Sequence, residues 1–140
     1  MAFKPGYLGD FRLDNAAGTL TNLQPYIDTV SVSQSGETLD VSALGTVAKA
    51  YIVGMQDGSI SFGGAYDTTV ATHLSAVRAA HAAGTATVSF QWGPGGSVAG
   101  QAKITGEAIL TGYDLSTSTG GRAEYSATLQ ISGVVTNGTF

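Results

Sequence analysis

The sequence predicts a mainly β fold: an antiparallel β-sandwich or barrel with one flanking helix. The clearest sign is the stretch from Ala123 to Ser132, in which apolar and polar residues alternate without a break. Successive side chains of a strand point to opposite faces, so this stretch is typical of a strand with one buried and one wet face. The composition agrees, because 20 glycines and only 11% charged residues suit short strands and turns better than a helical bundle.

The N-terminal third is expected to hold a flexible arm, two strands and a long loop. Residues 1–9 contain glycine and proline and show no period, which predicts an arm ahead of a single domain at 10–133. Strands are predicted from Asp10 to Asp14 and from Tyr26 to Ser33. Residues 34–45 begin polar and end weakly apolar, which predicts a loop. A loop of that length commonly contacts another chain.

The middle of the chain holds a hairpin signal and the helix. Asp57-Gly58 stands between an apolar run and a β-like run from Ser59 to Tyr66, which indicates a hairpin turn. A helix is predicted from about Thr68 to Ala83, where Asp67 or Thr68 can cap the start and Gly84 can close the end. Its apolar face recurs at helical spacing and consists of Val70, Leu74, Val77 and His81.

Three strands are expected after the helix. The stretch from Thr85 to Trp92 alternates, and the turn Gly93–Gly96 follows it. A long strand or a bulged pair of strands is predicted from Gln101 to Leu115, with a bulge or a close backbone approach at Gly106 and Gly112. The alternating strand from Ala123 comes next, and residues 134–140 are expected to form a tail.

Charge and composition argue against several classes of function. The net charge of −4 lacks the basic footprint of a protein that binds nucleic acid tightly. Cysteine is absent, and His73 and His81 are too far apart for the i, i+4 pair of a helical zinc site, so no metal or other cofactor is expected. No apolar run approaches the roughly 18 residues that a membrane span needs, so no membrane partner is expected.

No constellation of residues predicts an enzyme. No serine stands in a Gly-x-Ser-x-Gly motif. Glu107, Asp114 and Glu124 could converge across one hairpin, but acidic residues on strands are usually just solvated. Aromatic residues leave one binding function open, a monomeric β-sandwich module for carbohydrate that uses Trp92 and Tyr113.

Two stretches in succession resemble the major tail tube proteins of long-tailed bacteriophages. The first is Asp57-Gly58-Ser59-Ile60-Ser61-Phe62, which leads into the helix start at Tyr66-Asp67. The second is Gly106-Glu107-Ala108-Ile109-Leu110-Thr111-Gly112-Tyr113, followed by Ala127-Thr128-Leu129-Gln130-Ile131-Ser132-Gly133. The likeness extends from about Asn22 to Thr139 and rests on the order of these stretches.

The resemblance implies a structural subunit of the virion. Such proteins form hexameric rings that stack into a tube, through which the tape-measure protein and then DNA pass without specific binding. The protein would be made in the cytoplasm of the host bacterium and would meet tail terminator and tail-tip proteins. In such a tube a mostly uncharged strand face would line the lumen, and the candidates are Lys103, Thr105, Glu107, Glu124, Ser126, Thr128, Gln130 and Ser132.

Ring-to-ring contact is assigned to the predicted loop together with the N-terminal arm and the C-terminal tail. The stacking residues of that loop are Gln34, Ser35, Gly36, Glu37, Thr38, Leu39 and Asp40. Head-to-tail stacking needs two different surfaces on each subunit, and exposed segments can supply them. The same architecture would also serve as the inner tube of a contractile injection system or of a gene-transfer particle.

Overall fold

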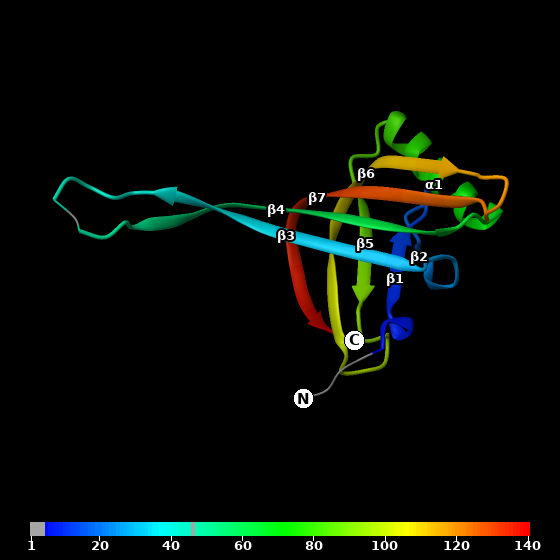
Figure 1. The fold of residues 1–140 in the computed structure, drawn as a ribbon, viewed down its shortest axis with the longest axis horizontal. Coiled ribbons are helices and arrows are strands. Elements are labelled where there is room, and N and C mark those ends of the chain that lie inside the picture. Colours follow the sequence, from blue (N-terminus) through cyan, green and yellow to red (C-terminus); the bar gives the residue numbers. More distant parts are fainter. Residues whose placement is uncertain (1–4, 46) are drawn as a thin grey trace.

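In a computed structural model, which describes residues 5–45 and 47–140, seven antiparallel strands form one sheet. The order across the sheet is β2-β1-β5-β6-β7-β4-β3 (Figure 1). The strands are β1 (Asp10–Asp14), β2 (Leu20–Asn22), β3 (Thr29–Asp40), β4 (Tyr51–Ala65), β5 (Val88–Gly93), β6 (Ala102–Ser116) and β7 (Glu124–Thr139). The helix α1 spans Thr68–Ala82, and two short 3-10 helices, η1 (Gly6–Leu8) and η2 (Gln24–Tyr26), flank β1 and β2.

The sheet bends back on itself because β6 and β7 each belong to two layers. Residues 107–116 of β6 pair with residues 124–132 of β7, and residues 102–105 pair with residues 136–139. The bend between these two blocks includes Gly133, whose φ of +91° is accessible to glycine at little steric cost. We call β3, β4 and the first of these blocks the first layer. The second layer contains β2, β1, β5 and the other block.

The hydrophobic core lies between the two layers. Phe11 of β1 and Phe62 of β4 are separated by three strands in the sheet, yet their ring centroids are 4.9 Å apart. This contact requires the layers to face each other, as in a sandwich. The fold class is therefore confirmed as mainly β with one helix, although the sheet does not close into a barrel.

Helix α1 joins the two layers at one end of the core. Asp67 caps it by accepting a hydrogen bond from the Thr69 N–H at 2.8 Å, and Val70, Leu74 and Val77 are fully buried. Near its C-terminus, the Nε2 atom of His81 accepts a hydrogen bond from the Leu110 N–H at 3.2 Å. The predicted helix is confirmed to within a residue.

The alternating strand and the two glycine irregularities are also confirmed. Along the first half of β7, Tyr125 and each second residue after it are buried, and the residues between them are exposed. The pairing of β6 with β7 shifts register on either side of Gly106 and again before Gly112. A Cβ atom at Gly106 would lie 3.1 Å from the Phe90 ring, so this position also requires a close approach.

The prediction of a loop over residues 34–45 was wrong for most of that segment. The strand β3 continues to Asp40 and pairs with β4, and the connection runs through residues 41–50. The distal halves of β3 and β4 form a two-stranded ribbon that projects from the body (Figure 1). Because the chain buries neither face of this ribbon, its sequence shows no alternation of apolar and polar residues.

The hairpin turn expected at Asp57-Gly58 was wrong as well, since both residues lie inside β4. Gly58 is opposite Gln34, and a Cβ atom there would be 2.8 Å from the Ser33 carbonyl oxygen and 2.9 Å from Cδ1 of Ile131. The glycine therefore serves a close approach between strands and not a turn. Asp57 accepts a hydrogen bond from Nε2 of Gln130 at 2.7 Å, which ties β4 to β7.

Residues 5–9 and the C-terminal segment 134–140 are more ordered than the sequence predicted. The expected tail at 134–140 is mostly strand, because β7 continues to Thr139, and the Phe140 N–H donates to the Gln101 carbonyl at 2.9 Å. Of the expected arm at 1–9, residues 1–4 lie outside the described residues. Gly6–Leu8 form η1, and Nε2 of Gln24 donates to the Gly9 carbonyl at 2.7 Å.

Candidate functional surfaces

The outer face of the first layer carries rows of small polar side chains. Because pairing partners lie on the same face, the register aligns residues of β3, β4, β7 and β6 across the layer. One row is Ser31, Ser61, Thr128 and Gly112, the next is Ser33, Ser59, Gln130 and Ile109, and a third is Thr29, Gly63, Ser126 and Asp114. Most of these positions are serine or threonine, and none is lysine or arginine. Neutral hydroxyl groups therefore dominate the three rows.

Six of the sequence-predicted lumen residues share this face. Five lie on β7 and are all exposed: Glu124, Ser126, Thr128, Gln130 and Ser132. Glu107 of β6 is opposite Ser132 and is also exposed. Its carboxylate accepts a hydrogen bond from the Ser89 hydroxyl at 3.0 Å.

Lys103 and Thr105 lie beyond the bend, in the block of β6 that pairs with residues 136–139. The Lys103 ammonium is 5.5 Å from the centroid of the Phe140 ring, within the range of a cation–π contact. The structure thus separates these two residues from the other six candidates. A lumen position for them stays a prediction.

Four serines of the same face escaped the sequence analysis, namely Ser31, Ser33, Ser59 and Ser61. Each alternates with a buried or half-buried residue, so the signal for an outward side chain was present. The missing information was the strand order, because nothing local in the sequence places β3 and β4 beside β7.

One end of this face carries a cluster of charged groups, whereas Glu107 lies at the other end. Arg122 forms ion pairs with Asp28 and, at 3.0 Å, with Glu124. The hydrogen bonds to Asp28 and Glu124 raise the pKa of Arg122 above its usual value. Two carboxylates therefore neutralise the Arg122 side chain. All three side chains are about half exposed, so these pairs contribute little to stability.

The structure does not bring the acidic residues Glu107, Asp114 and Glu124 together as one group. Glu107 is opposite Ser132, and Ser132 is eight residues from Glu124 along β7. At about 3.3 Å per residue, Glu107 and Glu124 are therefore roughly 26 Å apart. No group of histidine or acidic residues in the described part of the chain could hold a metal ion. The described helix is too short and too polar to cross a membrane.

The projecting ribbon exposes many apolar side chains. We call this ribbon, residues 34–58, the arm, which is distinct from the N-terminal segment. Within it β4 pairs with β3 alone. Leu44 and Val47 near the tip are fully exposed, and Val53 and Met55 keep 77% and 76% of their surface exposed. The other exposed apolar residues of the arm are Leu39, Val41, Tyr51 and Ile52. A two-stranded ribbon is marginally stable alone in water, so such a surface indicates contact with another protein.

Each side of the first layer ends in an unpaired strand edge. At one side β3 is the outermost strand of the sheet. At the other side β5 pairs with β6 only from Ile104 to Ala108, which leaves the second half of β6 without a neighbour on that side among the described strands. Unpaired edges of this length are available for pairing with another chain.

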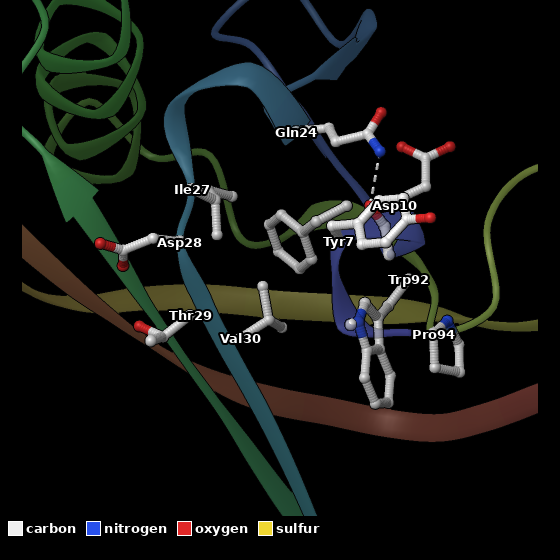
Figure 2. Close-up of a pocket in the computed structure, with 12 residues that line it drawn as sticks. Tyr7, Asp10, Gln24, Ile27, Asp28, Thr29, Val30, Trp92 and Pro94 are labelled. Atoms are coloured by element: carbon white, nitrogen blue, oxygen red, sulfur yellow. Dashed lines mark hydrogen bonds between the residues drawn. The ribbon is translucent and has the colours of Figure 1, made fainter. Parts of the chain in front are cut away.

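A cleft of about 840 Å³ opens where the two layers separate beside the start of β3. Figure 2 shows Ile27 and Val30 on one side of this cleft, and Tyr7, Trp92 and Pro94 on the other. Asp10 also lines the cleft, and its Oδ2 atom is 3.2 Å from the Arg12 guanidinium. Trp92 and Tyr113, the residues of the alternative carbohydrate site, are not brought together, because Trp92 is opposite Ile104 and Tyr113 lies nine residues further along β6.

A bent sheet with two free edges, an exposed apolar arm and a mostly neutral polar face is typical of a structural protein that contacts other chains. The comparisons with known proteins identify which one. The phage tail tube protein family matches residues 13–137, so the chain belongs to that family, whose members are subunits of the phage tail.

Solved structures with the same fold come from several kinds of tail. The tail of an empty gene transfer agent particle, computed with C6 symmetry, has a TM-score of 0.73 at 20% identity and covers 96% of this chain and 98% of its own. The SPP1 tail tube has a TM-score of 0.74 at 16% identity, with 99% and 80% covered. The tube-terminating cap of the anti-feeding prophage has a TM-score of 0.69 at 14% identity, with 100% and 93% covered. No curated protein matches the chain.

Proposed function

We propose that this tail tube subunit forms stacked hexameric rings in which the outer face of the first layer lines the lumen. The observation that carries the proposal is the set of aligned serine and threonine rows on one continuous face bounded by two free edges. The sixfold symmetry of the related gene transfer agent tail supports a hexamer. The role is structural and not catalytic.

The two free edges suggest how a ring closes. Neighbouring strands of the first layer alternate in direction from β3 to β6, so β3 and β6 run in opposite directions. The edge of β3 in one copy can therefore pair with the distal edge of β6 in the next copy and continue an antiparallel sheet. Six copies would close this sheet into a barrel without edges.

The chemistry of the face suits a channel for DNA. Each cation that contacts a phosphate adds affinity and would slow passage, and the three rows carry no cation. Neutral hydroxyl groups keep the wall wet, while Glu107, Asp114 and Glu124 add a mild repulsion of phosphate. The tape-measure protein would occupy the same channel before DNA passes.

The arm is the proposed contact between rings. It contains the predicted stacking residues Gln34–Asp40, now as a strand instead of a loop. The paired part of the arm on β3 covers roughly 20 Å at about 3.3 Å per residue, which lets it reach beyond its own ring. At the two ends of the tube, terminator and tip proteins would meet the surfaces left uncovered, as the relation to the anti-feeding prophage cap suggests.

Lysines on the face test the lumen assignment. We expect Thr128→Lys/Gln130→Lys to leave tubes intact, because both side chains are exposed, and to reduce DNA delivery by a phage that carries this subunit. The control is Ser75→Lys on the exposed side of α1, which should change neither property. Normal infection by the double lysine variant, with normal tubes in electron micrographs, would overturn the lumen assignment.

A contractile injection system or gene-transfer particle remains the second candidate setting. The likeness to the anti-feeding prophage cap and to the gene transfer agent tail favours it, because both share this fold. The genes beside the one that encodes this chain would decide, since a contractile system requires a sheath protein.

A further inference from the structure

We propose that the cleft beside the start of β3 receives the arm tip of a second copy of this chain. The inference rests on the proposed stacking of rings and assigns the two surfaces that would meet. The inserted residues are Leu44 and Val47, with Lys49 at the rim. The receiving residues are Tyr7, Ile27, Val30, Trp92 and Pro94, with Asp10 as the acidic partner.

The cleft has the properties of an incomplete core. Its walls come from η1, β1, the segment after η2, the start of β3 and the end of β5, and their side chains are mostly apolar (Figure 2). A cleft of about 840 Å³ is large enough for several side chains. Trp92 and Val30 are only partly buried in the isolated subunit, so an apolar insert would complete their burial.

The arm tip has the complementary properties. Leu44 and Val47 are fully exposed, which is costly for two aliphatic side chains so close in sequence. Lys49 is the one basic residue of the arm, and it has no ion-pair partner among the described residues. The tip thus presents two aliphatic groups and one cation.

The cleft offers a carboxylate to this cation. Asp10 is 3% exposed, and its Oδ1 atom has no hydrogen-bond partner within the described part of the chain. Arg12 contacts only the other oxygen, Oδ2. A buried carboxylate oxygen without a partner is costly, and an incoming ammonium group would remove that cost.

The positions of tip and cleft favour a second copy over the same chain. Val30 and Thr29 of the cleft begin β3, whereas the tip follows the end of β3, so the two surfaces lie at opposite ends of one long strand (Figure 1). A subunit cannot fold its own arm back along this strand while β3 remains paired with β4. A protein with a knob at one end and a hole at the other assembles head to tail without closing.

Disulfide trapping tests the contact, and the chain suits it because it contains no cysteine. Leu44→Cys/Pro94→Cys places one thiol at the tip and one at the exposed rim of the cleft. Under oxidation of assembled protein we expect a ladder of covalent multimers in non-reducing gels. Leu44→Cys/Ser75→Cys is the matched control and should stop at dimers, since Ser75 is exposed on α1 and outside the cleft.

Trp92 provides a second measurement, because it is the only tryptophan of the chain. We expect its emission to shift to shorter wavelength and its quenching by acrylamide to fall when tubes form. Leu44→Ser/Val47→Ser should keep the emission of the unassembled subunit and should not form tubes.

The outcomes separate this inference from the proposed function. Tubes that form without the ladder and without a change in Trp92 emission would overturn the tip-in-cleft contact and leave the tube assignment intact. Rings and tubes that never form under any condition would overturn both. Tubes with a ladder specific to the Pro94→Cys partner would establish the contact.

Discussion

Single residues determine how closely the strands of the first layer approach one another. Gly58 shows this most clearly, since its missing Cβ atom would lie 2.8 Å from a backbone carbonyl and 2.9 Å from Ile131. We expect Gly58→Ala to reduce the free energy of unfolding by about 1–3 kcal/mol through overpacking. Gly138→Ala is the control in the same sheet, because nothing lies within 4 Å of its Cβ position. Equal urea midpoints for the two variants would contradict the packing.

His73 gives the fold a dependence on pH. It belongs to α1 and its side chain is buried, its Nε2 atom is 3.0 Å from the Asp14 carbonyl, and burial lowers its pKa below 6.5. The unfolded chain then binds the proton first. The contribution of neutral His73 to the free energy of unfolding is therefore fully present above pH 6.5. It declines as the pH falls from there to the pKa of His73 in the folded protein.

The measurement for His73 is urea unfolding on both sides of pH 6.5. His73→Gln keeps a donor for the Asp14 carbonyl and removes the titration, so we expect the difference between the two pH values to shrink. An unchanged pH dependence in this variant would assign the effect to another group.

Individual residues of the candidate face were partly accessible from the sequence. The alternation in β7 identified Ser126 and Thr128 because one side of that strand is buried and the other is wet. The turn predicted at Asp57-Gly58 was wrong, because a dipeptide that favours a turn also permits a close approach between paired strands. A local sequence pattern does not distinguish these two uses of glycine.

At the scale of elements, the arm is the part with the least support from its own chain. We expect a variant in which residues 39–52 are replaced by Asn-Gly to fold normally, since Thr38 and Val53 are paired and can be joined by a two-residue turn. Rings should form and stacking should be lost. The checks are an unchanged thermal midpoint and rings without tubes in electron micrographs. Tubes of normal length from this variant would remove the arm from the stacking account.

The elements differ in how well the sequence predicts them. Helix α1 and the first half of β7 each bury one face against the core, so their apolar periods are visible. The distal parts of β3 and β4 bury no face within the chain, so no apolar period marks them as strands. Strands that bury no face within their own chain are for this reason poorly predicted from one sequence.

At the scale of the whole molecule, the order of the strands in the sheet could not be predicted from the sequence. The first layer joins β3 and β4 from the early chain to β6 and β7 from its end, and such long-range pairing leaves no local trace. The expectation of a tube came from the resemblance to tail tube proteins. Only the structure shows that serines and threonines of β3, β4 and β7 are aligned in rows.

Closure of the ring predicts a pattern of amide protection. In the isolated subunit the free edges of β3 and of distal β6 should exchange their outward amides quickly, because water is their only partner. Assembly should protect residues 29–33 and 112–115, while α1 stays unchanged as the internal control. Protection confined to the arm would mean that rings do not form through these edges.

The central claim is that the outer face of the first layer lines the tube. A helical reconstruction of tubes assembled from the purified protein tests it most directly. We expect six subunits around a lumen whose wall contains Ser31, Ser61 and Thr128, with α1 away from it. A lumen lined by α1 or by the second layer, or a protein that remains monomeric at every concentration, would show that this face does not line a tube.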